Sequence, residues 1–104
     1  MTDSKKISWT EVEDKICCQA FLEEYVFLKK DTDVEKVLDD IKDYENFIER
    51  DRSSIRMRLQ NIKALVEELH IQNTARITPL NNAASQTRRI LQEELKKMTE
   101  GKSR

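Results

Sequence analysis

The sequence predicts an all-α protein, and its composition is the first reason. The 104 residues include one Gly and one Pro, which leaves almost no material for the tight turns of a β-sheet. Charged residues make up 38 % of the chain, a share typical of helices with solvated faces. The second reason is that apolar residues recur at steps of three and four along most of the sequence. A chain of this length is expected to form one domain with a modest core.

A first helix is expected from Thr10 to about Leu28. Thr10 and Glu13 have the spacing of a capping box, and Trp9 can pack back on the helix as a hydrophobic staple. The apolar side chains that follow make a broad face, so most of this helix should be buried. Before it, residues 1–8 are polar and are expected to form a mobile arm.

A second amphipathic helix is predicted after a short turn at residues 29–31. Thr32 and Glu35 again have the spacing of a capping box, and apolar side chains recur as far as Tyr44. The outer face of this helix carries three carboxylates, those of Asp39, Asp40 and Asp43. One interpretation of them is a solvated face, and the other is a surface that imitates the phosphates of a nucleic acid.

The third helix, from about residue 52 to residue 69, has two neighbouring strips. The first strip is apolar and consists of Ile55, Leu59, Ile62, Val66 and Leu69. The second strip is polar and consists of Arg52, Arg56, Gln60 and Lys63. Both continue over several turns, so the helix can pack on one side and present cations to a partner on the other. Because Lys and Arg are also common on solvated helix faces, a face without a partner is the competing interpretation.

Residues 70–80 are rich in Gln, Asn and Thr and are expected to form a loop. A last helix over residues 81–100 can be capped by Asn81 or Asn82. The predicted architecture is therefore a three-helix core over residues 9–69 with a C-terminal helix.

Catalytic and metal-binding chemistry finds little support in the sequence. His70 is the one histidine, a single Gly cannot build a Gly-rich phosphate loop, and no Cys or His pair has zinc spacing. Cys17 and Cys18 are neighbours in a predicted helix, where a bridge would strain the backbone, so both are expected to be reduced thiols. No signal peptide or apolar run long enough to span a membrane occurs. We expect a cytoplasmic protein that is not an enzyme and uses no cofactor or metal.

Charge is divided unevenly along the chain. Residues 1–49 carry seven Lys and fourteen Asp or Glu, a net −7, whereas residues 50–104 carry twelve Lys or Arg and six acids, a net +6. A chain divided in this way can place a basic face on an anionic partner and turn its acidic half away, or it can pair head to tail with a second copy.

An arrangement of three helices with a cationic third helix is typical of a helix-turn-helix of the Myb or homeodomain kind. Residues 8–14, SWTEVED, resemble the Trp-Thr-x-x-Glu-Asp opening of SANT/Myb-like domains. Residues 52–62, RSSIRMRLQNI, resemble the Ser-Ile-Arg-Met-Lys-Leu-x-Asn-Ile run of a module found before HNH nuclease domains in prokaryotic restriction-type proteins. In that module a loop leads to a Ser-Asn-Ala-Ser-x-x-Thr segment, to which residues 81–87, NNAASQT, are similar.

This resemblance implies recognition of DNA without cleavage, because the 104 residues contain no nuclease domain. The loop after Leu69 also lacks the Gly-rich turn of that module. The positions that match the family's motif are Arg52, Ser54, Arg56, Arg58 and Asn61. Arg58 and Asn61 lie nearer the margins of the apolar strip, so packing is the alternative role for these two.

The first functional hypothesis is a small prokaryotic or phage module that binds double-stranded DNA through its third helix. Arg56 and Gln60 are expected at base edges, and Arg52 and Lys63 at phosphates. The full set of expected DNA contacts is Lys5, Lys6, Arg50, Arg52, Ser54, Arg56, Arg58, Gln60 and Lys63.

The alternative hypothesis is a compact helical inhibitor or adaptor, such as a phage-type anti-defence protein, that binds a nucleic-acid-binding protein. Its acidic contacts are then Asp39, Asp40 and Asp43. A third hypothesis is a homodimer joined through the last helix by Ala84, Ile90, Leu91 and Leu95.

Overall fold

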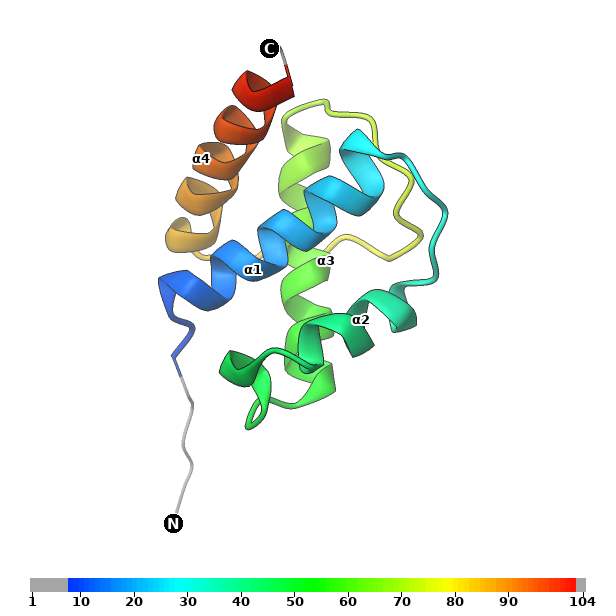
Figure 1. Cartoon of the computed structure of the whole chain (residues 1–104). Coiled ribbons are helices and arrows are strands. Elements are labelled where there is room, and N and C mark those ends of the chain that lie inside the picture. Colours follow the sequence, from blue (N-terminus) through cyan, green and yellow to red (C-terminus); the bar gives the residue numbers. More distant parts are fainter. Residues whose placement is uncertain (1–7, 103–104) are drawn as a thin grey trace.

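Four α-helices make up most of the protein, in a computed structural model that describes the backbone of residues 8–102 and the side chains of residues 8–100 (Figure 1). They are α1 (Glu11–Phe21), α2 (Val34–Lys42), α3 (Arg52–Glu68) and α4 (Ser85–Lys102). A π-helical segment, η1 (Leu22–Phe27), continues α1, and a 3₁₀ turn, η2 (Glu45–Phe47), follows α2. No strand occurs in the described part of the chain, so the predicted all-α class is confirmed.

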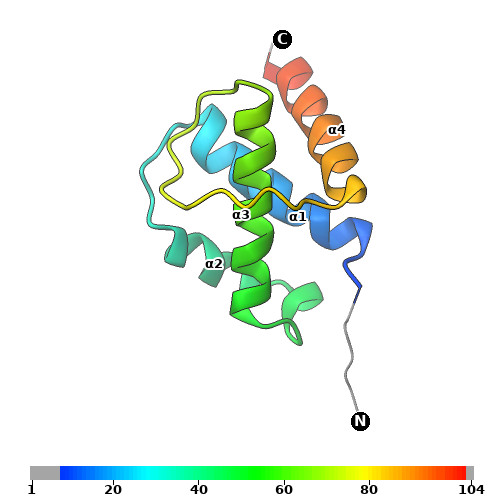
Figure 2. The same ribbon diagram turned by 180° about the vertical axis from the view of Figure 1, so that it is seen from behind.

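α3 is the central helix, because other segments cover it on opposite sides. α1 crosses one side of it, and the loop over residues 69–84 crosses the other (Figure 2). Six successive residues of α3, numbers 61–66, are buried as a result. A helix that packs on one side only would keep every third or fourth position exposed. Residues 61–66 therefore present no exposed polar strip, in contrast to the two separate strips expected from the sequence.

The core draws one or more large side chains from each of the four helices and from η2. Each of them is less than 2 % exposed, and burial of such a side chain stabilises a fold by about 1.5–3 kcal/mol. They are Phe21, Leu22, Tyr25, Leu38, Ile41, Phe47, Ile55, Leu59, Ile62, Val66 and Leu91. α4 is thus part of the same packed unit as the three helices before it.

The apolar side of α4 is used within the molecule. Ile90 and Leu91 are buried, Leu95 is half-buried, and Ala84, which precedes the helix, is exposed. Of the four side chains expected to join two copies, Ala84 is therefore the one that faces solvent fully.

The predicted N-terminal cap of the first helix is confirmed. The Thr10 hydroxyl accepts from the Glu13 N–H at 3.2 Å, and the Glu13 carboxylate accepts from the Thr10 N–H at 2.9 Å. Both orphan amides of the helix start are satisfied in this way. The cap predicted for the last helix is not formed, because Asn82 Oδ1 accepts from Asn61 Nδ2 at 2.7 Å and α4 begins only at Ser85.

The second predicted capping box is wrong by one residue. The N-cap of α2 is Asp33, whose carboxylate accepts from the Glu35 N–H at 2.9 Å. The Thr32 hydroxyl instead donates to the carboxylate of Glu24 on η1. Thr32 is therefore engaged by a segment that the local pattern could not include.

Two residues with positive φ mark the ends of helical segments. Lys29 (φ 51°) follows η1, and His70 (φ 60°) follows α3. A left-handed conformation costs a residue with a Cβ roughly 1–2 kcal/mol, which is why Gly is common at this position. Here Lys29 and His70, which both carry a Cβ, occupy these left-handed positions.

No helix in residues 8–102 is sufficiently long and apolar to cross a membrane.

Candidate binding surface

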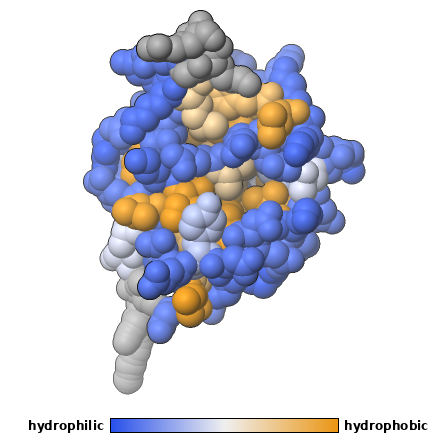
Figure 3. Space-filling view, viewed as in Figure 1, coloured by the Kyte–Doolittle hydropathy of each residue, from blue (hydrophilic) through white to orange (hydrophobic). Residues whose placement is uncertain are grey.

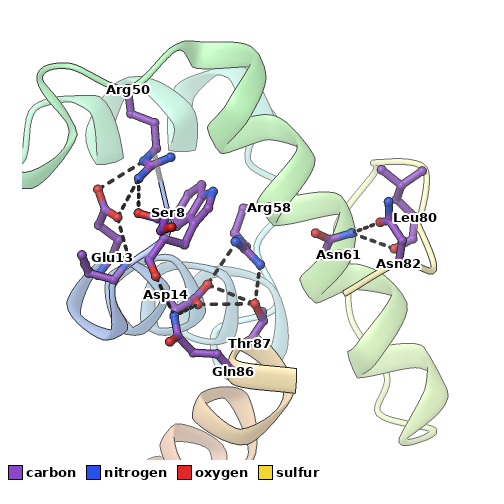
Figure 4. A network of polar contacts seen from close by, with 12 residues as sticks. Ser8, Glu13, Asp14, Arg50, Arg58, Asn61, Leu80, Asn82, Gln86 and Thr87 are labelled. Carbon is purple, nitrogen blue, oxygen red and sulfur yellow. Dashed lines mark hydrogen bonds and ion pairs between the residues drawn. The ribbon is translucent and has the colours of Figure 1, made fainter. Parts of the chain in front are cut away.

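Arg50 is an interior side chain. Its Nη2 donates to Glu13 Oε1 at 2.8 Å and to the Ser8 carbonyl at 3.2 Å, and its Nε donates to Glu13 Oε2 at 3.2 Å (Figure 4). The guanidinium also lies over the Trp9 ring, 4.2 Å from its centroid. A planar guanidinium suits both contacts, because it forms paired hydrogen bonds with a carboxylate and stacks on an aromatic ring. Arg50 therefore fastens the start of α1 to the turn before α3.

Arg58 lies on the same ring, with its guanidinium carbon also 4.2 Å from the centroid. Its Nε is 3.2 Å from Asp14 Oδ1, without the alignment of a hydrogen bond, so this contact is an ion pair. Its Nη1 donates to the Thr87 hydroxyl, and Gln86 Nε2 donates to Asp14 Oδ2 at 2.8 Å (Figure 4). Asp14 is fully buried, so its charge depends on these partners. The cluster joins α1, α3 and the start of α4.

Lys63 is held by the loop that crosses α3. Its Nζ donates to Asn73 Oδ1 at 2.8 Å and to the Ala75 carbonyl at 3.0 Å, and it pairs with Glu67 at 2.8 Å. The side chain is consequently only 11 % exposed. Asn61 has a similar role nearby, where its Nδ2 donates to the Leu80 carbonyl at 2.9 Å.

Arg52 and Arg56 are the cations of α3 that reach solvent, with side chains 40 % and 41 % exposed. Both are paired with α2: Arg52 with Glu35 and Asp39, and Arg56 with Glu35. Hydrogen bonds from Arg56 and Arg52 lower the pKa of Glu35, and hydrogen bonds to Asp39 and Glu35 raise the pKa of Arg52. The acidic helix therefore neutralises the exposed part of the basic strip.

Four expected DNA contacts remain: the uncharged Ser54 and Gln60 on α3, and Lys5 and Lys6 before α1. Ser54 and Gln60 are partly exposed, and the Gln60 carbonyl accepts from the Leu80 N–H at 3.1 Å. Lys5 and Lys6 lie outside the described residues. The nine positions thus do not form one exposed basic face: Arg50, Arg58 and Lys63 are buried because carboxylates, carbonyls and the Trp9 ring enclose them.

The carboxylates of α2 have a different setting. Asp39, Asp40 and Asp43 are all exposed. Asp39 faces Arg52, whereas Asp40 and Asp43 form no ion pair with any residue of the described range 8–100. Neighbouring carboxylates without a counter-ion produce a negative local potential.

Among the hollows of the described surface, two lie beside α2 or α3. The larger, about 410 Å³, is at the end of α3 and is lined by Lys29, Glu67, Ile71, Gln72, Asn73 and Thr74. The smaller, about 200 Å³, lies between α1 and α2 and is lined by Ile16, Gln19, Ala20, Glu23, Glu24, Val37, Asp40, Ile41 and Tyr44. Neither lining contains a His, Cys or Ser side chain that could act as base or nucleophile. In the described part of the chain, no three His, Cys, Asp or Glu side chains are grouped to hold a metal ion.

Comparison with known proteins finds no relative of this chain. No protein-family model, curated protein or solved structure matches the chain. The resemblance to SANT/Myb-like modules therefore stays a prediction.

Proposed function

We propose that this chain is a non-catalytic protein-binding module whose acidic α2 face, made by Asp39, Asp40 and Asp43, meets a basic surface of its partner. One observation carries the proposal. Asp40 and Asp43 are exposed and unpaired within residues 8–100, whereas the cations of α3 are either buried or already paired with α2.

The physical reason is electrostatic. An exposed acidic patch attracts a basic surface, suppresses approach to polyanions, and speeds association at low salt. A nucleic-acid-binding protein offers a basic surface of this kind, because its phosphate-binding face is rich in Lys and Arg. The α2 carboxylates then occupy the place of the phosphates.

A labelled peptide of alternating Lys and Ser tests the acidic face by fluorescence polarisation. The double variant Asp40→Asn/Asp43→Asn should bind it about fivefold more weakly than the wild type, since each exposed charge contributes about 0.5 kcal/mol. The control Glu11→Gln/Glu93→Gln changes the net charge equally, on the side of α1 and α4. An equal loss in both variants would show attraction by net charge alone and refute a specific face.

DNA binding by the first half of α3, as in a helix-turn-helix, is the second candidate. The observation in its favour is that Arg52 and Arg56 are exposed in their pairs with α2. Exposed ion pairs contribute only about 0–1 kcal/mol, so a phosphate can replace the carboxylates at small cost.

Polarisation of a labelled random duplex at about 50 and 200 mM salt tests this candidate. Two neutralised phosphates predict a salt slope near −1.8 and a loss of affinity of roughly tenfold between these concentrations. The variant Arg52→Glu/Arg56→Glu should abolish binding. A flat salt response, or no binding at either concentration, would eliminate DNA as the partner.

A further inference from the structure

The groove between α1 and α2 has an apolar floor whose α1 side is partly exposed. Ile16 and Ala20 come from α1, the buried Val37 and Ile41 come from α2, and Tyr44 also lines the groove. Tyr44 is 51 % exposed, and Ile16 and Ala20 are only partly buried. Figure 3 shows patches of apolar surface, in orange, across the middle of this face of the molecule, interrupted and bordered by hydrophilic surface.

A small residue creates the space. Ala20 stands in the middle of the α1 side of the groove, between the larger neighbours Ile16 and Glu23 of the lining. Residues three and four apart share one face of a helix, so a short side chain between longer ones leaves a hole of the kind that receives a knob from another helix. The volume of about 200 Å³ is below the roughly 300–1,000 Å³ of small-molecule sites and suits a single inserted side chain.

The rim of the groove is acidic. Glu23, Glu24 and Asp40 line it with the amide of Gln19, and the lining contains no Lys or Arg. The Thr32 hydroxyl donates to Glu24 and fixes its carboxylate. Glu23 and Asp40 form no ion pair with any residue of the described part. Glu23 of η1 and Asp40 of α2 thus line the same groove, and neither is paired with a cation of residues 8–100.

These features specify the chemistry of the occupant. An apolar side chain has to fill the floor, and cations on both sides of it have to meet Glu23 and Asp40. A helix with Leu, Ile or Phe at one position and Lys or Arg three or four residues away on either side satisfies both requirements. Within residues 8–100 a second copy of this chain offers no such helix, because the apolar residues Ile90 and Leu91 of its basic α4 are buried.

We propose that the groove between α1 and α2 is the docking site for a basic amphipathic helix of a partner protein, with one apolar anchor seated against Ala20 and its flanking cations paired with Glu23 and Asp40. The inference rests on the proposed protein-binding function and adds the class of partner segment and the place where it binds.

Two labelled peptides of equal charge test the inference. One is a Leu and Lys peptide with Leu at helical spacing, and the other is the Lys and Ser peptide described above. The amphipathic peptide should bind the wild-type protein at least about tenfold more tightly, since one buried anchor supplies that factor. Amide chemical shifts of the wild-type protein should move for residues of α1 and α2 that line the groove.

Ala20→Phe is the decisive variant, because it fills the groove and leaves every charge in place. It should bind the two peptides equally, at the affinity of the polar one. Ala84→Phe is the matched control, since Ala84 is exposed and lies outside the groove, and it should keep the tenfold preference. Thermal melts establish that both variants fold. If Ala20→Phe does not fold, the chemical shift changes of the wild-type protein decide whether the peptide binds in the groove.

The outcomes separate this inference from the function on which it rests. Equal affinity of the wild type for the two peptides, or an undiminished preference in folded Ala20→Phe, overturns the docking groove and leaves the acidic face intact. Shift changes confined to other helices overturn it as well. Binding of neither peptide overturns both the groove and the proposed function.

Discussion

Replacement of Arg58 by Ala should destabilise this protein far more than replacement of Arg56, although both lie on α3 two residues apart. Arg58→Ala removes the ion pair of Asp14 and one face of the Trp9 stack while Asp14 stays fully buried. Breaking a buried pair by removing one partner costs about 3–5 kcal/mol, because a charge is left without compensation. Arg56 is 41 % exposed in its pair, so Arg56→Ala should cost less than about 1 kcal/mol.

Urea unfolding followed by helical circular dichroism measures both losses. The total stability of a domain is about 5–15 kcal/mol, so Arg58→Ala should remove a third or more of it in a typical case. The single tryptophan, Trp9, should report the same transition by fluorescence, because Arg50 and Arg58 both contact its ring. A loss below about 1 kcal/mol for Arg58→Ala, equal to that for Arg56→Ala, would refute the reasoning.

The double variant Asp14→Leu/Arg58→Met separates the charge from the packing. Replacing a buried ion pair by apolar side chains of similar volume is often neutral or stabilising. The double variant should therefore be more stable than Arg58→Ala alone. If it is equally unstable, the stacking of Arg58 on Trp9 and its bond to Thr87 matter more than the uncompensated charge.

Three further measurements follow from the structure. Cys17 and Cys18 are buried, which raises the pKa of both thiols, so a disulfide reagent should modify them only in denaturant. Hydrogen bonds from Arg56 and Arg52 lower the pKa of Glu35, so its pairs stabilise the fold above about pH 4.3 and lose this effect as pH falls through the lowered pKa. Glu35→Gln should therefore reduce the loss of urea resistance between about pH 7 and 3. His70→Gly should raise the free energy of unfolding by about 0.5–1 kcal/mol in thermal or urea melts, because φ is positive there.

Local patterns in the sequence predicted the helices well. The capping box of Thr10 and Glu13 is a pattern of neighbours, and the structure forms it as expected. The apolar strip of α3 likewise enters the core. Such features depend mainly on residues a few positions apart. The box predicted at Thr32 failed because a more distant residue, Glu24, accepts from its hydroxyl.

The fate of the basic residues could not be predicted in the same way. Helical spacing places Lys63 on a polar strip, but only the path of the distant loop decides that Asn73 and Ala75 cover it. Arg58 pairs with a carboxylate 44 positions away, and no local pattern links the two. Whether a polar strip of a helix is exposed depends on the distant segments that pack on it, and the spacing of residues within the helix does not reveal them.

The opposite charges of the two halves of the chain have a use inside the molecule. They were expected to serve an external partner or a second copy, but many of them pair within the fold. Acidic residues of the first half meet basic residues of the second half in the pairs Glu11–Arg89, Glu13–Arg50, Asp14–Arg58, Asp31–Arg76, Glu35–Arg52, Glu35–Arg56 and Asp39–Arg52. Asp40 and Asp43 are among the acidic residues of the first half that are left out of this pairing, as Glu23 is.

The loop over residues 69–84, which crosses α3, is fixed to the rest of the fold by hydrogen bonds. The Thr74 N–H donates to the Tyr25 carbonyl at 3.0 Å, and the Leu80 N–H donates to the Gln60 carbonyl at 3.1 Å. Between these two hydrogen bonds, Lys63 Nζ donates to the Ala75 carbonyl at 3.0 Å. Composition alone would suggest this stretch for an inserted sequence, yet an insertion between Thr74 and Leu80 would disturb these hydrogen bonds. The turn around Ile48 is held in a similar way, because Lys42 Nζ donates to the carbonyls of Phe47 and Ile48, each at 3.1 Å, and Phe47 is buried.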